Sequence, residues 1–267
     1  MRRKIFLMMA GLLAAYLLVL YTFQEKFYFW PTKGYRPPTE AGFPFYEKAL
    51  TMADGTTGMV WYAEGRKEMP SILFLHGNAY QLEKFAPLLM PYVDKGYSVY
   101  MLEYRGFGGV AGKPSQENMF SDATVVFDWI KSRSETPVVV YGYSFGCAVA
   151  MGLTLHRTPD AVILQAPFAS LKQLVKEKPV PFASYLLKAP FASDKAVQHY
   201  TNPLLIVHGT QDTLIPVHHA QVLFHLSGSP DKTFVPFDGK GHRFFFDGTA
   251  MPTIEKWIDN RFKKGGA

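Results

Sequence analysis

The sequence predicts an α/β fold with a mostly parallel central sheet flanked by helices, preceded by one N-terminal transmembrane helix. From residue 71 onward, short apolar runs alternate with longer stretches of helical spacing. This alternation is typical of parallel strands covered by helices on both faces. The transmembrane helix is predicted by residues 5–23, which contain no charged side chain.

The composition indicates a well-packed chain without a nucleic-acid partner. Of its 267 residues, 48% are hydrophobic and 15% aromatic, which is ample for a sizeable core and argues against extensive disorder. The net charge is +6, but basic residues cluster at positions 2–4 and 263–264. Because the middle of the chain is nearly balanced in charge, no basic stripe indicates nucleic acid.

Cys147 is the single cysteine. It therefore forms no intramolecular disulfide, and no metal site can be built from several cysteines. Its place just inside a predicted helix favours a small buried hydrophobic residue over a reactive thiol.

The N-terminus predicts an uncleaved signal anchor at residues 5–23, behind a cytoplasmic basic tail at residues 1–4. As a helix, the uncharged stretch spans about 28 Å, close to the thickness of a bilayer. A cleaved signal peptide would have a shorter apolar region followed by a small-residue cleavage site, and a buried core helix would not be apolar all round. The remainder is expected on the non-cytoplasmic side, which is the periplasm in a Gram-negative bacterium and the lumen in a eukaryote.

Residues 24–42 are expected to form a connector, and residues 43–267 a single globular domain. A hairpin with an Asp54-Gly55 turn opens this domain. The later strands are predicted at 71–75, 97–102, 138–140, 161–165, 204–208 and 233–237, and the helices at 82–93, 118–132, directly after residue 146, at 216–226 and at 249–262.

Residues 168–200 break the alternation of strand and helix. Pro179, Pro181 and Pro190 interrupt short apolar helical pieces in this segment. Because it is too long for an ordinary connection, we expect a cap over a binding site.

A serine lies where the strand at 138–140 turns sharply into the next helix. The turn reads Gly142-Tyr-Ser144-Phe-Gly146. Such a turn holds its serine in a strained conformation that exposes the hydroxyl, and the two glycines leave room for the neighbouring backbone. Ser144 is therefore the candidate nucleophile.

Two later strand ends supply the other groups that a nucleophilic serine needs. Asp212 follows the strand at 204–208, and His242 lies on a glycine-flanked loop after the strand at 233–237. In a parallel sheet these strand ends meet at one edge. His242 would serve as the general base and then acid, while Asp212 would orient it. Asp238 is the alternative acid, and capping of the helix near Pro216 is the alternative role for Asp212.

Two backbone N–H groups are expected to stabilise the developing oxyanion. The N–H of Phe145 opens a helix and has no intrahelical acceptor. The second donor should come from the turn after residues 71–75, where the N–H of Asn78 is favoured and that of Ala79 is the second choice. His76 is expected to order this turn rather than act as a base.

Together these motifs resemble the α/β-hydrolase superfamily. The resemblance runs from about Phe43 to the C-terminus, and with the N-terminal apolar stretch it is similar to the membrane-anchored serine hydrolases. The motifs that carry it are His76-Gly-Asn-Ala79, Tyr104-Arg-Gly-Phe-Gly108, Gly142–Gly146, His208-Gly-Thr-Gln-Asp212 and Gly241-His242, with catalytic residues in the order Ser, Asp, His. One departure is Arg243-Phe-Phe-Phe246, where relatives often carry a small polar residue; it predicts a more apolar pocket wall.

The resemblance implies a serine hydrolase that cleaves carboxylic ester or thioester bonds of a small-molecule acyl substrate and needs no metal or cofactor. A serine peptidase of the same fold and a membrane-tethered binding module without activity are the alternatives. His208, His218, His219 and His225 are expected to be structural or exposed. The sequence assigns no substrate-contacting residues, although aromatic residues of the cap (Phe168, Phe182, Tyr185 and Phe191) are candidates for acyl contact. It leaves the oligomeric state open.

Overall fold

The computed structural model describes residues 1–262, which contain one eight-stranded sheet in the order β1-β2-β4-β3-β5-β6-β7-β8. The first two strands pair antiparallel and all the later pairs are parallel except β2 with β4. The mostly parallel α/β fold predicted from the sequence is confirmed. The strands are β1 (Tyr46–Thr51), β2 (Thr57–Ala63), β3 (Ser71–Leu75), β4 (Ser98–Glu103), β5 (Val138–Tyr143), β6 (Ala161–Gln165), β7 (Leu204–Gly209) and β8 (Lys232–Phe237).

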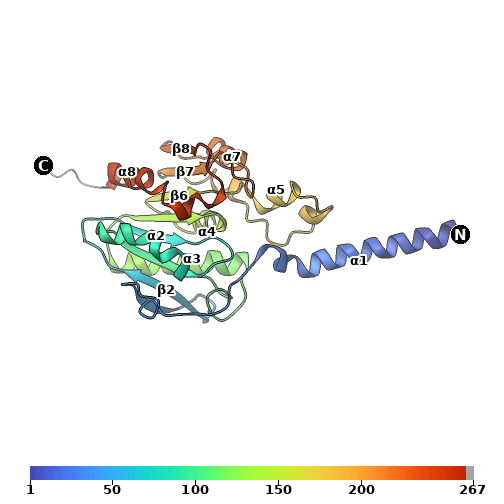
Figure 1. Ribbon diagram of the computed structural model, residues 1–267, viewed down its shortest axis with the longest axis horizontal. Coiled ribbons are helices and arrows are strands. Elements are labelled where there is room, and N and C mark those ends of the chain that lie inside the picture. The colour runs from blue at the N-terminus through green and yellow to red at the C-terminus, as the bar shows by residue number, and fades with distance from the viewer. Residues whose placement is uncertain (263–267) are drawn as a thin grey trace.

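Helices cover both faces of this sheet (Figure 1). Alternate residues of each central strand face opposite layers: Leu73 belongs to the buried cluster that includes α3, α4 and α7, whereas Phe74 belongs to the cluster that includes α2 and α8. The helices are α1 (Arg2–Tyr28), α2 (Leu82–Asp94), α3 (Gln116–Arg133), α4 (Phe145–Leu153), α5 (Leu171–Lys176), α6 (Ser193–Ala196), α7 (His218–Leu226) and α8 (Met251–Phe262), with short 3-10 turns η1 (Ala183–Tyr185) and η2 (His242–Asp247).

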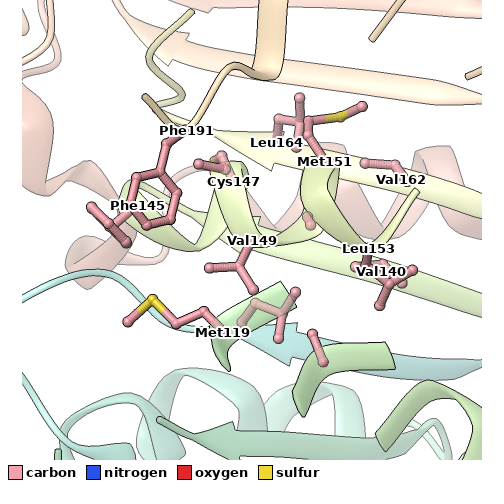
Figure 2. Packing of buried hydrophobic residues seen from close by; sticks show 14 of the residues in the cluster. Met119, Val140, Phe145, Cys147, Val149, Met151, Leu153, Val162, Leu164 and Phe191 are labelled. Atoms are coloured by element: carbon pink, nitrogen blue, oxygen red, sulfur yellow. The ribbon is translucent and has the colours of Figure 1, made fainter. Parts of the chain in front are cut away.

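Helix α4 is buried along its whole length. Its side chains fill the space between the sheet and α3, and Figure 2 shows Phe145, Cys147 and Val149 in this layer. The Cys147 thiol donates to the carbonyl oxygens of Gly142 (3.1 Å) and Gln165 (3.2 Å). Burial raises the pKa of Cys147, so the expectation of an inert buried residue is confirmed.

Helix α1 projects away from the domain, with the N-terminus at its far end (Figure 1). In the part of the chain that is described, it is the one helix long and apolar enough to cross a membrane, with a mean hydropathy of 2.2 in its most apolar window. It ends at Tyr28, five residues beyond the predicted boundary at Phe23.

The segment after Phe23 continues helix α1 to Tyr28 and then packs into the domain core. Tyr28 and Phe29 are buried in the domain core, and the Phe29 ring packs edge-on against Phe145 at 5.6 Å between centroids. The assignment of residues 24–42 as a connector was therefore too simple. Hydropathy locates the apolar stretch, but it does not show that aromatic residues behind it pack against distant parts of the chain.

Residues 168–200 contain only the short helical pieces α5, η1 and α6. This segment, called the cap from here on, lies beside the C-terminal half of α1. The Tyr16 hydroxyl donates to the carbonyl oxygen of Pro181 (2.9 Å), and the Gln24 amide bonds the backbone of Leu186 and Lys188. The cap is thus held to the apolar helix by polar side chains.

Candidate active site

The turn between β5 and α4 places Ser144 in a conformation that is rare for residues with a side chain. Its φ is 52° and its ψ is −115°. A Cβ atom at Gly146 would lie 1.9 Å from the carbonyl oxygen of Leu75, and one at Gly142 would lie 2.5 Å from that of Gly146. Only glycine fits at both positions, and this close packing maintains the strain at Ser144.

The loops after β5, β7 and β8 bring the predicted serine, acid and base into contact. Ser144 Oγ lies 2.9 Å from His242 Nε2, and His242 Nδ1 lies 2.7 Å from Asp212 Oδ2. Asp238 has no contact with this histidine in the structure; its carboxylate accepts a hydrogen bond from the Thr210 hydroxyl. The geometry therefore favours Asp212 over Asp238 as the acid.

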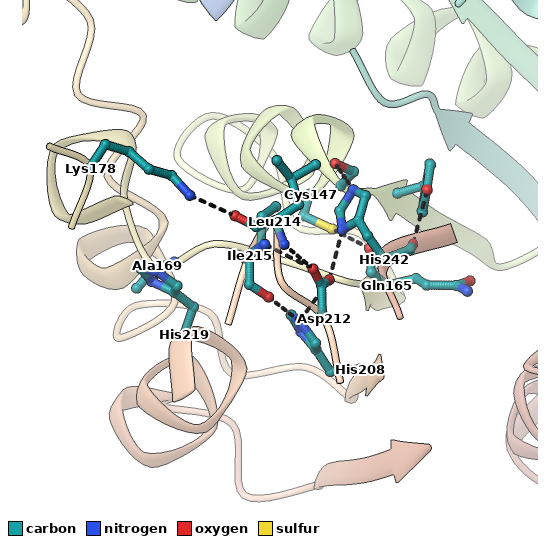
Figure 3. Close-up of polar contacts among 12 residues, drawn as sticks. Cys147, Gln165, Ala169, Lys178, His208, Asp212, Leu214, Ile215, His219 and His242 are labelled. Carbon is teal, nitrogen blue, oxygen red and sulfur yellow. Dashed lines mark hydrogen bonds and ion pairs between the residues drawn. The ribbon is translucent and has the colours of Figure 1, made fainter. Parts of the chain in front are cut away.

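Asp212 is held ionised by its surroundings. Burial alone would raise the pKa of this carboxylate, but hydrogen bonds from His208 and His242 and from the backbone hold the pKa well below its usual range. Its Oδ1 accepts the N–H groups of Leu214 (2.9 Å) and Ile215 (2.8 Å). Figure 3 shows Asp212 at the centre of these contacts.

His208, which the sequence predicted to be structural or exposed, is a buried residue that contacts Asp212. Its Nε2 lies 2.8 Å from the carbonyl oxygen of Ile215 and 3.2 Å from Asp212 Oδ2, and the side chain is fully buried. Because a carbonyl accepts only from a protonated nitrogen, Nε2 carries the hydrogen and donates it to the Ile215 carbonyl oxygen, with Asp212 Oδ2 close beside it. The four-residue spacing to Asp212 was visible in the sequence, but it did not reveal the side-chain contact.

Tyr143 supports the base from the other side. Its hydroxyl donates to the carbonyl oxygen of His242 (3.2 Å), and its ring stacks on Phe245 at 4.5 Å. Burial raises the pKa of Tyr143, so the phenol stays neutral and keeps donating.

The turn after β3 lies against Ser144. A Cβ at Gly77 would be 3.3 Å from the Ser144 Cβ. Within residues 1–262 the structure records no acceptor for the N–H of Asn78 or of Phe145, whereas the Ala79 N–H donates to Asn78 Oδ1 (3.1 Å). This favours Asn78 over Ala79 as the second oxyanion donor, and the assignment of both donors stays a prediction.

The Asn78 side chain has a further role that the sequence did not suggest. Its Nδ2 donates to the carbonyl oxygen of Tyr28 (2.7 Å), and its Oδ1 accepts the N–H of Trp30 (3.0 Å). The predicted oxyanion turn is therefore bonded directly to the end of α1.

A pocket of about 390 Å³ opens at Ser144 and is lined mainly by apolar side chains. Of the four cap aromatics, Phe168 lines it, Phe191 lies in the core against Phe145, and Phe182 and Tyr185 are exposed. The end of α1 and the residues directly after it also line the pocket, which the sequence did not predict. These lining residues are Phe27, Tyr28 and Trp30.

The segment after the histidine divides between pocket and core. Arg243 and Phe246 line the pocket, whereas Phe244 and Phe245 are buried behind it. The expected apolar wall is thus formed by one phenylalanine, with a guanidinium beside it. A larger surface depression of about 720 Å³ near Arg66 and Glu255 lies away from Ser144, is lined largely by charged side chains and has no part in this site.

The other histidines match their expected structural roles. His76 donates from Nδ1 to the carbonyl oxygen of Gly77 (2.7 Å) and lies 3.1 Å from buried Glu103. Glu177, His218 and His219 come close enough for their ligand atoms to lie within 4.8 Å of one another. However, His219 Nδ1 accepts the Ala169 N–H, so its Nε2 carries a proton that faces Glu177. This nitrogen has no lone pair to offer a metal.

The fold and this arrangement of residues define the class: the chain belongs to the α/β-hydrolase superfamily. A family model described as serine aminopeptidase, S33 (Hydrolase_4) matches residues 67–197. Lysophosphatidylserine lipase ABHD12 of Rattus norvegicus is 32% identical over 234 residues, covering 73% of this chain and 57% of the relative. The chain thus spans little more than half the length of that relative.

This chain covers a larger share of two other similar proteins. An uncharacterized protein of Mycobacterium tuberculosis is 27% identical over 234 residues, covering 85% of this chain and 83% of that protein. Among solved structures, esterase Pf2001 of Pyrococcus furiosus superposes with a TM-score of 0.67 at 19% identity, over 88% of this chain and 97% of the esterase. At that identity the likeness shows the shared fold.

Proposed function

We propose that this protein is a membrane-anchored serine hydrolase that cleaves carboxylic ester or thioester bonds of acyl substrates. The observation that carries the proposal is the continuous contact from Ser144 Oγ to His242 Nε2 (2.9 Å) and from His242 Nδ1 to Asp212 Oδ2 (2.7 Å). These are the contacts that convert a weakly nucleophilic hydroxyl into an attacking group.

In the first half-reaction, Ser144 Oγ attacks the acyl carbon while His242 Nε2 takes its proton. The carbonyl oxygen becomes an oxyanion that accepts hydrogen bonds from the N–H groups of Asn78 and Phe145. His242 then returns the proton to the departing alcohol or thiol, which leaves an acyl ester on Ser144. In the second half-reaction, water attacks this ester by the same route and releases the acid. No step requires a metal or cofactor.

The pocket supports an acyl substrate. Its lining is largely apolar, and burial of apolar substrate surface favours binding. A lysophosphatidylserine lipase is among the relatives, which supports a lipid ester as the substrate class.

We further propose that residues 5–23 of α1 anchor the protein, with residues 43–267 as the hydrolase domain on the non-cytoplasmic side. The basic residues at positions 2–4 favour a cytoplasmic N-terminus. A reporter fused to the C-terminus tests this orientation: alkaline phosphatase should be active in a bacterial host, and a cytoplasm-dependent fluorescent protein should be dark. The opposite pattern would place the domain in the cytoplasm.

Fluorophosphonate labelling tests the enzyme assignment. Wild type should label and hydrolyse p-nitrophenyl esters, whereas Ser144→Ala should not label and should lose at least about a thousandfold in kcat. Ser132→Ala, at an exposed serine on α3, is the matched control and should behave as wild type. A wild type that binds acyl ligands without labelling would instead be a binding module.

The family description favours one second candidate, hydrolysis of peptides from their N-terminus. Aminoacyl anilides distinguish the two activities. Turnover of these amides above that of the matching esters would assign the site to peptides.

A further inference from the structure

We propose that the pocket at Ser144 continues into a channel between α1 and the cap, and that this channel holds the acyl chain of the substrate and opens towards the bilayer. The inference rests on the proposed function and adds the path by which the substrate reaches the serine.

Two adjoining cavities form this path. The pocket at Ser144 shares four lining residues with a second cavity of about 280 Å³: Phe27, Tyr28, Val175 and Lys178. The second cavity runs along α1 from Tyr28 back to Leu20, and Val180, Ala183 and Leu186 of the cap close its other side. The two cavities therefore adjoin across these four side chains, at the point where α1 meets α5.

The chemistry of the second cavity fits a hydrocarbon chain. Most of its lining is aliphatic or aromatic, with the amide of Gln24 and the ammonium of Lys178 as the polar exceptions. Both polar groups are already engaged: Gln24 bonds the backbone of Leu186 and Lys188, and Lys178 Nζ donates to the carbonyl oxygen of Leu214 (3.2 Å). The Tyr28 hydroxyl, which lies where the two cavities meet, is the one polar group of this lining that is buried without a hydrogen-bond partner among the described residues.

The position of the cap places the open end of the channel beside lipid. The Tyr16 hydroxyl bonds to the carbonyl oxygen of Pro181, so the tip of the cap lies level with the uncharged stretch 5–23. Around this tip, Val180, Phe182 and Tyr185 expose large apolar surfaces. Exposed apolar surface next to a membrane helix is favourable only where it meets hydrocarbon.

The cations around the cap suit the edge of the bilayer. Lys188 Nζ lies 4.3 Å from the centroid of the Tyr21 ring, and Lys26 Nζ lies 5.2 Å from that of Phe23. Tyrosine and lysine pairs of this kind are typical of the headgroup level. An ester whose chain lies in the channel would thus present its carbonyl to Ser144 while its headgroup stays on the far side, near Trp30 and Arg243.

A series of p-nitrophenyl esters from acetate to palmitate tests the channel in the full-length protein in detergent micelles. For wild type, kcat/KM should rise by about fourfold for each methylene that the channel buries. Leu186→Trp fills the channel, so it should reduce the preference for palmitate over acetate, measured as the ratio of kcat/KM values, by at least tenfold.

Leu155→Trp is the matched control, because this leucine is exposed at the end of α4 and lines neither cavity at α1. It should keep the wild-type preference. An unchanged preference in Leu186→Trp, with normal acetate turnover, would overturn the channel while leaving the proposed function intact. A wild type inactive on every ester and unlabelled by fluorophosphonate would contradict the proposed function, and the channel with it.

A second measurement does not depend on the folding of any variant. A fluorophosphonate with a long alkyl chain and a terminal diazirine is attached to Ser144 of wild type, photolysed, and mapped by mass spectrometry. The channel predicts cross-links at residues 20–28 and 180–187. Cross-links confined to the opposite wall, at Tyr80 or Phe246, would overturn it.

Discussion

The carboxylate of Asp212 is fixed on both oxygens. One oxygen accepts two backbone N–H groups of its own loop, and the other faces the two imidazoles of His208 and His242. A carboxylate bound in this way holds the His242 imidazole in one orientation.

The lowered pKa of Asp212 predicts how acid affects stability. Because its folded pKa lies below the ordinary value of 3.8, the ionised group stabilises the fold above that pH, and this contribution is lost as the pH falls through the folded value. The difference in Tm between wild type and Asp212→Asn should therefore be largest near neutral pH and should shrink in acid. Thermal unfolding between pH 3 and pH 7 measures this difference.

Asp238→Asn is the control, since it removes an exposed carboxylate that does not touch His242. If the difference in Tm between wild type and Asp212→Asn stayed unchanged down to pH 3, the pKa of Asp212 would not be lowered.

At the scale of residues, strand ends explain what the sequence predicted. Ser144, Asp212 and His242 each follow a parallel strand, and such strands meet at one edge, so their proximity follows from the order of elements. The contact of His208 with Asp212, and the hydrogen bonds of the Asn78 side chain to the backbone of residues 28 and 30, could not be predicted in this way. They depend on side-chain directions that only tertiary packing determines.

The junction of β5 and α4 is the most tightly constrained link between elements. Gly146→Ala would press its Cβ against the carbonyl oxygen of Leu75, which lies 1.9 Å away. We expect this substitution to cost about 3 kcal/mol of stability and to abolish labelling, because the turn has to shift. Gly11→Ala, in α1 with nothing within 4 Å, is the control and should be neutral or slightly stabilising. Wild-type Tm and labelling in Gly146→Ala would contradict this view of the turn.

The contact between α1 and the cap depends on Gln24. Gln24→Ala would leave the carbonyl oxygen of Leu186 and the N–H of Lys188 without their partner, at a cost of about 1–3 kcal/mol. Amide hydrogen exchange in residues 180–190 should become faster. The exposed control Gln198→Ala should leave exchange there unchanged. Unaltered exchange in Gln24→Ala would show that the cap is held by other contacts.

Among the elements, the bounds of short apolar strands were easier to predict than the C-terminal end of helix α1. Strands β3 and β6 have the predicted bounds because flanking breakers delimit their apolar residues. Helix α1 continues past Phe23 because Gln24, Glu25 and Lys26 are good helix formers, although they are too polar for a membrane pattern.

At the scale of the whole molecule, the end of α1 and the residue after it belong to the core of the domain. Phe29 packs on Phe145, the residue next to Ser144. Phe29→Ala should therefore create a cavity, cost about 3–5 kcal/mol and reduce fluorophosphonate labelling as well as Tm. Phe6→Ala, at an exposed position of α1, should change neither. Equal effects of the two substitutions would show that the contact of Phe29 with the domain core does not support the site.

The bond from Asn78 to the end of α1 has a mechanical consequence. Transmembrane helices change their tilt when the hydrocarbon thickness of the bilayer changes. Because Asn78 holds both the Tyr28 carbonyl and the Trp30 N–H, a change of tilt would pull on the turn that carries its own backbone N–H. We therefore expect turnover to be greatest where the membrane matches the uncharged stretch, about 28 Å, and to fall in thinner or thicker lipid. The thickness of the surrounding membrane would then regulate the enzyme without any ligand.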